Sequence, residues 1–154
     1  MNKAVCLFGA LATLILLNSC FTTSVEEADN SKPLGNFVLT GPTIGKLSIA
    51  PTSCDVGQRQ LFLGFDFLDQ KLGMVTRLVV DPVTGPVARV FKVDKPYDMS
   101  IIYHRAECKT FHFSLDSTGW LVNHIQMLQV SVELDCQLAS GDRIIGNAKD
   151  SSCL

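Results

Sequence analysis

The sequence predicts an all-β domain, either an antiparallel β-sandwich or a small barrel. From Phe37 onward, short runs rich in Val, Ile, Leu and Phe are cut by Gly, Pro, Asp and Ser about every eight to twelve residues, which is the spacing of short strands in such folds. Residues 110–115 and 130–136 also alternate between apolar and polar side chains, so each segment places one face on a core. No run is long and periodic enough to predict a helix.

The expected strands are residues 46–50, 60–68, 74–80, 87–93, 99–103, 109–115, 127–138 and 143–148. Turns are expected at residues 81–85 (DPVTG), 116–119 (DSTG) and 140–142 (SGD), because each combines turn-forming residues with a glycine that accepts a positive φ. The last of these turns is short enough to join its two strands as a hairpin.

The size and charge of the chain limit the classes of function. It has 154 residues, which corresponds to one domain. Thirteen basic and fifteen acidic residues give a formal net charge of −2, without a cluster of either sign. Proteins that bind nucleic acids need a basic patch or stripe for the phosphates, so no nucleic acid partner is expected.

The N-terminus has the pattern of an export signal. Residues 4–17 follow the positive Lys3 and are almost entirely hydrophobic, as in the central region of a secretory signal peptide. The run ends at polar Asn18 and is shorter than the roughly twenty apolar residues that span a bilayer. We therefore expect residues 1–19 to be a signal peptide and not a permanent transmembrane helix.

The end of this segment, Leu17-Asn18-Ser19-Cys20, resembles the lipobox of bacterial lipoproteins, with a leucine three positions before a cysteine. The resemblance implies that Cys20 receives a thioether-linked diacylglycerol and becomes the first mature residue. It also implies that the new amino group is acylated with a fatty acid such as palmitate. An ordinary secretory signal cleaved after Ser19 is disfavoured, because it would place the bulky Leu17 where a small residue is required.

The lipid on Cys20 implies a membrane as the first partner of the protein. Two or three acyl chains on one residue anchor a protein stably, whereas one chain does not. Phe21 follows the cysteine. In lipoproteins of two-membrane bacteria, which the motif resembles, the absence of an aspartate at this position implies transport to the outer membrane.

Residues 20–36 are polar and acidic and show no apolar period. Such a composition predicts a disordered segment, because it buries too little apolar surface to offset the entropy of ordering. We therefore expect a lipidated cysteine and flexible tether over residues 20–36 and a folded β domain over residues 37–154.

Six cysteines are present, but Cys6 lies in the signal peptide and Cys20 would carry the lipid. The four that remain for the fold are Cys54, Cys108, Cys136 and Cys153. An exported protein meets an oxidising compartment, so two disulfides are expected. Three pairings are possible, and the sequence does not choose among them. The four cysteines contain no C-x-x-C pair, which disfavours a zinc site.

Three further residues have the spacing of metal ligands on a helix. His104, Cys108 and His112 are four residues apart, but along a strand this separation is about 13 Å, beyond the reach of a shared metal. We expect no metal site and no cofactor. The sequence contains no nucleophile elbow, phosphate-binding loop or metalloprotease motif, so no enzymatic activity and no catalytic residue are expected.

Aromatic residues supply both core positions and binding candidates. Four phenylalanines alternate with other residues in expected strands and are assigned to the core: Phe65, Phe67, Phe111 and Phe113. Phe62 would lie on the opposite face, together with Gly64, which leaves a gap beside it. Trp120 follows the turn expected at 116–119. We expect Phe62 and Trp120 to mark a partner-binding surface.

Four segments of the expected domain are residues 46–54 (KLSIAPTSC), 118–123 (TGWLVN), 133–136 (ELDC) and 141–146 (GDRIIG). With these segments, the domain resembles a group of uncharacterised small exported β-rich lipoproteins of predatory and gliding bacteria. The resemblance implies a place in the cell envelope. It implies no activity, and it transfers no functional residue beyond Cys20.

The functional hypothesis is a non-enzymatic lipoprotein of the outer membrane that binds or supports another envelope protein, for example as an accessory to a surface or motility machine. The sheet edges and loops of a β domain suit such contacts. The alternative is a secreted or periplasmic module that binds a ligand or inhibits a hydrolase.

Overall fold

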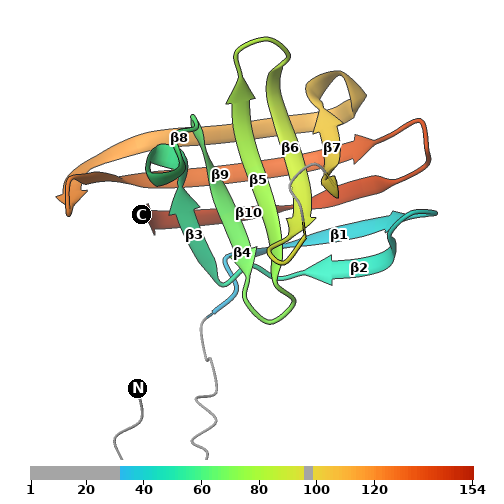
Figure 1. Cartoon of the computed structure of the whole chain (residues 1–154), viewed down its shortest axis with the longest axis horizontal. Helices are drawn as coiled ribbons and strands as arrows, with labels where there is room; N and C mark the ends of the chain where they lie inside the picture. Colours follow the sequence, from blue (N-terminus) through green and yellow to red (C-terminus); the bar gives the residue numbers. More distant parts are fainter. Residues whose placement is uncertain (1–31, 96–98) are drawn as a thin grey trace, which may run out of the picture. The chain divides into compact units, whose positions relative to one another are not determined.

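A computed structural model describes residues 32–95 and 99–154 of the chain. The predicted signal peptide, Cys20 and most of the predicted tether lie outside the described residues. Within them, two five-stranded antiparallel sheets pack against each other (Figure 1). The predicted all-β sandwich is confirmed, and the structure chooses it over the small barrel.

The first sheet has the strand order β2-β1-β10-β9-β8. Its strands are β1 (Gly35–Gly41), β2 (Gly45–Ile49), β8 (Cys108–Val122), β9 (Ile125–Gln137) and β10 (Arg143–Cys153). The first and last described strands are neighbours in this sheet, because β10 pairs with β9 on one side and with β1 on the other.

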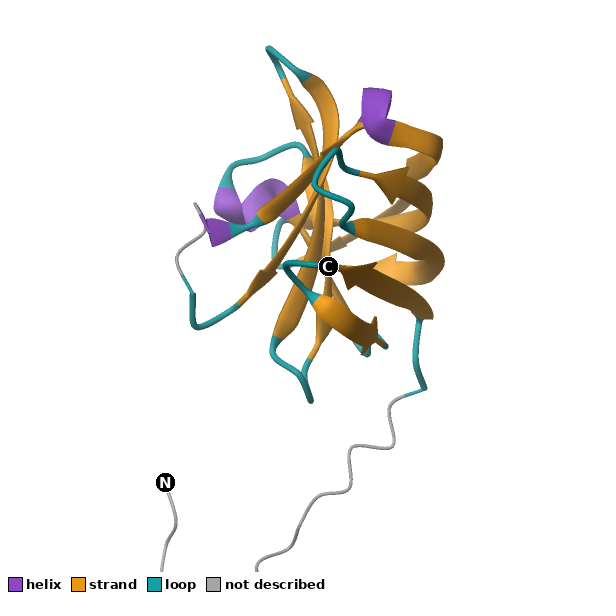
Figure 2. Cartoon of the chain, turned by 90° about the vertical axis from the view of Figure 1, so that its right-hand side faces the viewer, coloured by secondary structure: helices purple, strands orange, loops and turns teal. Residues whose placement is uncertain are grey.

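The second sheet is a meander in the order β3-β4-β5-β6-β7. Its strands are β3 (Ser53–Val56), β4 (Gly64–Asp69), β5 (Met74–Asp81), β6 (Gly85–Lys92) and β7 (Ile101–His104). The short 3-10 helix η1 (Gly57–Gln60) joins β3 to β4, and η3 (Arg105–Glu107) leads from β7 back to the first sheet. Figure 2 shows the two sheets from the side as separate layers.

The two sheets are joined covalently where β10 ends. A disulfide links Cys54 of β3 to Cys153 of β10, and the Val56 N–H donates a hydrogen bond to the Leu154 carbonyl (3.1 Å). The second disulfide, Cys108 to Cys136, joins β8 to its neighbour β9 within the first sheet. The four cysteines thus form the two predicted disulfides, and the structure decides the pairing.

The core lies between the sheets and is built from alternate residues of each strand. The largest fully buried side chains include Phe37, Phe65, Phe67 and Tyr103. The rings of Phe65 and Phe67 meet edge to face with centroids 5.3 Å apart, an arrangement that adds to their hydrophobic burial. The predicted core positions are confirmed, with Phe111 buried and Phe113 partly buried against the same cluster.

Each expected strand has a counterpart in the structure, but two observed strands were not expected. β1 begins at Gly35, two residues before the predicted domain boundary, and backbone hydrogen bonds already tie Leu34 to Pro51 and Lys149. β3 has only four residues. In β1 only residues 37–39 are apolar and glycines occupy both ends, and β3 is too short to show a period, so the apolar pattern of both strands is weak.

The strand expected over residues 60–68 is wrong in its first half. η1 ends with Leu61 in the left-handed conformation (φ 60°), which stops an extended chain before β4 begins at Gly64. Phe62 therefore precedes the strand. Gly64 itself is required by close approach, because a Cβ there would collide with the Leu78 carbonyl oxygen.

The turn expected at residues 116–119 is also wrong. These residues belong to β8, where the register with β9 shifts between Ser117 and Leu121. Gly119 has a φ of 80° within this irregular stretch, so its conformational freedom serves a bulge. The chain reverses at Asn123 and His124, both with positive φ, as a two-residue hairpin loop requires.

The turns at 81–85 and 140–142 are confirmed. Asp81 pairs with Gly85, and the Asp81 carboxylate accepts hydrogen bonds from the Val83 and Thr84 N–H groups at 2.8 Å each.

Across residues 32–95 and 99–154, no helix has the length and apolar character to cross a membrane.

Candidate binding surfaces

The two predicted partner-binding residues lie on different surfaces. Trp120 is 72% exposed near the end of the β8–β9 hairpin. Phe62 is only partly exposed, because its ring lies 4.2 Å from the guanidinium carbon of Arg77 on the outer face of the second sheet. The structure therefore presents two candidate surfaces, and each is built from different elements.

The surface around Phe62 is organised by an ion pair. Arg77 of β5 lies directly opposite Asp66 of β4, and its Nε and Nη2 donate to the two carboxylate oxygens at 2.7 and 2.6 Å. Nη2 also donates to the Gln60 side chain. The guanidinium lies over Phe62 and near Phe91, an arrangement favourable for a cation. We call these five residues the Arg77 cluster.

The cluster is unusually well buried for the outer face of a sheet. The side chains of Arg77 and Asp66 retain only 15% and 8% of their exposure. Burial raises the pKa of Asp66 above its ordinary value, the hydrogen bond and charge of Arg77 oppose this rise, and the nearby Asp55 carboxylate adds to it. Arg77 is therefore the main group that favours the ionised form of Asp66.

Sequence analysis missed the pairing of Asp66 with Arg77, although a signal existed. Each residue is a charge in the middle of a largely apolar strand, and the two are equidistant from the centre of residues 70–73, which connect β4 to β5. Opposite charges placed symmetrically about a hairpin turn face each other across the ladder. This symmetry identifies the pair without a structure.

A depression adjoins the cluster, with a volume of about 300 Å³. Its walls include the apolar side chains of Leu68, Val75, Phe91 and Val93, and its polar lining comes from Asp55 and members of the Arg77 cluster. It combines a hydrophobic wall with carboxylates, as small binding sites do.

The second surface is the end of the β8–β9 hairpin, which we call the hairpin tip (residues 120–125). Trp120 and Leu121 are 72% and 68% exposed. Leu61, which is 94% exposed, follows η1, and η1 reaches this region because the Gln126 N–H donates to the Gln58 side chain (3.1 Å). In Figure 1 this hairpin end extends to the left beyond β3. Two large apolar side chains are thus exposed at a projecting point of the fold.

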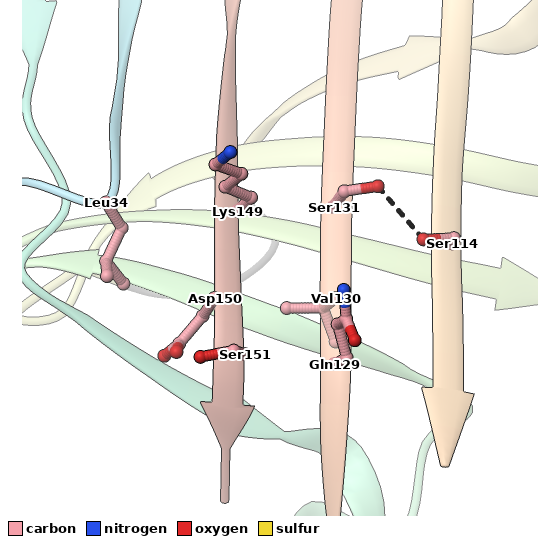
Figure 3. Close-up of a pocket in the computed structure, with 8 residues that line it drawn as sticks. All are labelled: Leu34, Ser114, Gln129, Val130, Ser131, Lys149, Asp150 and Ser151. Carbon is pink, nitrogen blue, oxygen red and sulfur yellow. Dashed lines mark hydrogen bonds between the residues drawn. The ribbon is translucent and has the colours of Figure 1, made fainter. Parts of the chain in front are cut away.

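A third region is a groove of about 340 Å³ on the outer face of the first sheet. Figure 3 shows its floor, formed by β8, β9 and β10, with the Ser114 and Ser131 hydroxyls hydrogen-bonded at 2.9 Å. Lys149 and Asp150 stand on β10, and Leu34 lies at one side. The polar side chains here are open to solvent, as expected for the outer face of an antiparallel sheet.

The described part of the chain contains no group of three or more His, Cys, Asp and Glu side chains that could hold a metal ion. His104 and His112 belong to β7 and β8, in different sheets.

Searches of protein-family models, curated proteins and solved structures find no match to this chain.

Proposed function

We propose that the protein is a non-enzymatic lipoprotein of the bacterial outer membrane whose β-sandwich binds another envelope protein. The lipobox-like residues ending at Cys20 support the anchor. The two disulfides support export, because such bonds persist in oxidising compartments and are rare in the cytosol.

The single observation that carries the binding role is the hairpin tip. A tryptophan and a leucine that are more than two-thirds exposed leave apolar area in water that a protein partner would bury. Tryptophan is enriched among the residues that dominate binding energy at protein interfaces. The two-residue turn at Asn123 and His124 holds the tip in a defined conformation, so little entropy is lost when it binds.

Site-specific cross-linking in cells tests the binding role. A photoreactive amino acid replaces Leu121 in the full-length protein, and in a matched control it replaces Val83, which is 90% exposed at the β5–β6 turn. We expect a discrete cross-linked protein from position 121 that is absent from position 83. Adding Trp120→Ser should abolish that product. Identical products from both positions, or a product that survives Trp120→Ser, would contradict the proposal.

Cell fractionation tests the anchor. Cys20→Ala should remove the protein from membranes, while Cys6→Ala, in the part that is cut away, should leave it there. Phe21→Asp should shift the protein from the outer to the inner membrane on a density gradient. Membrane partition that is unchanged by Cys20→Ala would refute the lipid anchor.

A module that inhibits a hydrolase is the second candidate, because the projecting hairpin has the form of a loop that inserts into a cleft. In that case the protein cross-linked from position 121 would be a hydrolase, and Trp120→Ser would relieve its inhibition. A cross-linked protein without hydrolytic activity would dismiss this candidate.

A further inference from the structure

The outer face of the second sheet carries a row of four charges. In the strand register, Asp55 faces Asp66, Asp66 faces Arg77, and Arg77 faces Arg89. Arg77 forms the ion pair with Asp66, and Arg89 interacts electrostatically with Asp81. Asp55 is exposed and forms no salt bridge within the described ranges. The β3 end of the row therefore presents a negative charge beside a neutralised pair.

Two like charges face each other where Asp55 meets Asp66. Such a pair is unfavourable in an antiparallel ladder. Arg77 pairs with Asp66, and Arg89 lies beyond Arg77 in the row, so both positive charges are on the far side of Asp66 from Asp55. A cation placed at Asp55 would relieve this repulsion, whereas an anion would increase it.

The neighbouring row of the same sheet face is apolar. Leu68 faces Val75, and Val75 faces Phe91. Val75 is only 6% exposed although it points away from the core, whereas Val93, at the edge of the same depression, is 63% exposed. A ligand that fits this face therefore needs an apolar part as well as a positive charge.

We propose that this depression binds a basic side chain, lysine or arginine, of the protein partner, with its cation at Asp55 and its methylene stem against Val75 and Phe91. Both side chains combine an apolar stem with a charged end. The volume of about 300 Å³ is at the small end for ligand cavities, so the depression holds one side chain and not an extended segment.

This inference rests on the proposed function, because it names the chemistry of a group on the partner. It concerns a different face from the hairpin tip. A partner that uses both surfaces would present a basic side chain beside an apolar pocket for Trp120.

Nuclear magnetic resonance tests the site with defined probes. The full-length lipoprotein, labelled with nitrogen-15 and purified in neutral detergent, is titrated with three capped tripeptides that carry lysine, arginine or the uncharged norleucine between two glycines. We expect saturable amide shifts in β3, β5 and β6 for the lysine or arginine peptide, and binding about fivefold weaker for the norleucine peptide, as for one exposed charge contact.

Asp55→Asn is the decisive variant, and Asp116→Asn on β8 is the matched control. Because Asp55 is exposed, forms no salt bridge within the described ranges and repels Asp66, the variant should keep or slightly raise its urea midpoint while binding to the basic peptides weakens about fivefold. Asp116→Asn should leave binding unchanged. Equal binding of all three peptides, shifts confined to other surfaces, or full binding by Asp55→Asn would each overturn the proposal. Cross-linking at Leu121 tests the hairpin tip and the titration tests the depression beside Asp55. The two experiments are independent, so either proposal can be refuted without the other.

Discussion

Among the described residues, each sheet has an arginine–aspartate ion pair on its outer face, and the two pairs differ in burial. Arg77 and Asp66 on the second sheet retain 15% and 8% of their side-chain exposure, whereas Arg143 and Asp135 on the first sheet retain 43% and 20%. Aromatic rings cover the first pair, and water reaches the second. The same type of ion pair therefore holds a buried cluster of side chains together on one sheet and lies in contact with solvent on the other.

The largest losses of stability are expected when the disulfides are removed. Cys54–Cys153 joins the two sheets across a sequence separation of 99, and Cys108–Cys136 lies within the first sheet with a separation of 28. Loop-closure entropy predicts losses of about 4.7 and about 3.6 kcal/mol when each pair is replaced by alanines. Urea denaturation of the two double variants measures this order. A greater loss for the pair within the first sheet would contradict it.

The ion pairs come next. Arg77→Met should lower the free energy of unfolding by about 3 to 5 kcal/mol, because it leaves the Asp66 carboxylate buried without a counter-ion. Arg143→Met, the matched control on the more exposed pair, should lower it by about 1 kcal/mol or less. Equal losses in urea denaturation would show that burial does not distinguish the two faces.

The pH dependence gives a smaller effect with a definite sign. The pKa of Asp66 is raised on folding from its ordinary value of 3.8, so the folded state binds more protons and the free energy of unfolding falls as the pH rises above 3.8. Asp66→Asn should lack this fall. Urea denaturation from about pH 3 to about pH 7 measures it.

Asp81 provides the opposite case. Hydrogen bonds from the Thr84 and Val83 N–H groups lower its pKa, so its contribution is present above pH 3.8 and is lost as the pH falls below that value. Asp81→Asn should remove this loss in the same measurement. The difference in free energy of unfolding between wild type and variant should therefore change with pH in opposite directions for Asp66→Asn and Asp81→Asn. A change in the same direction would contradict the assignment of both groups.

The smallest effect is expected on the solvated face. Ser114→Ala removes a hydroxyl that is hydrogen-bonded to Ser131 near the surface of the first sheet, and it should change the free energy of unfolding by no more than about 0.5 kcal/mol. A loss above about 2 kcal/mol in urea denaturation would mean that the groove in Figure 3 is part of a tightly packed site.

The sequence predicts those features that depend on local pattern. Alternation over residues 130–136 identifies the buried face of β9, and export chemistry identifies the two disulfides. The position of the reversal after β8 could not be predicted from turn residues, because Gly119 occupies a bulge and the turn forms at Asn123 and His124. Propensity alone does not separate a bulge from a turn.

The candidate site was predicted only in part. Trp120 was expected at a binding surface and is exposed, whereas Phe62 was placed on a strand and instead lies against Arg77. The Cys54–Cys153 disulfide and the approach of η1 to the hairpin tip depend on how the two sheets pack, which no short segment encodes. The register that places Asp66 opposite Arg77 could be predicted from the sequence, but only if β4 and β5 were treated as the two strands of a hairpin.

The early start of the fold at Leu34 has a mechanical consequence. Leu34 is hydrogen-bonded to Lys149 of β10, and β10 pairs with β9, which leads to the hairpin tip. Because Lys149 faces Ser131 of β9, the chain enters the domain toward the tip end of the first sheet, roughly 20 Å from residue 125. A pull between Leu34 and a partner held at the tip would therefore peel β1 away from β10 one hydrogen bond at a time, starting at Gly35.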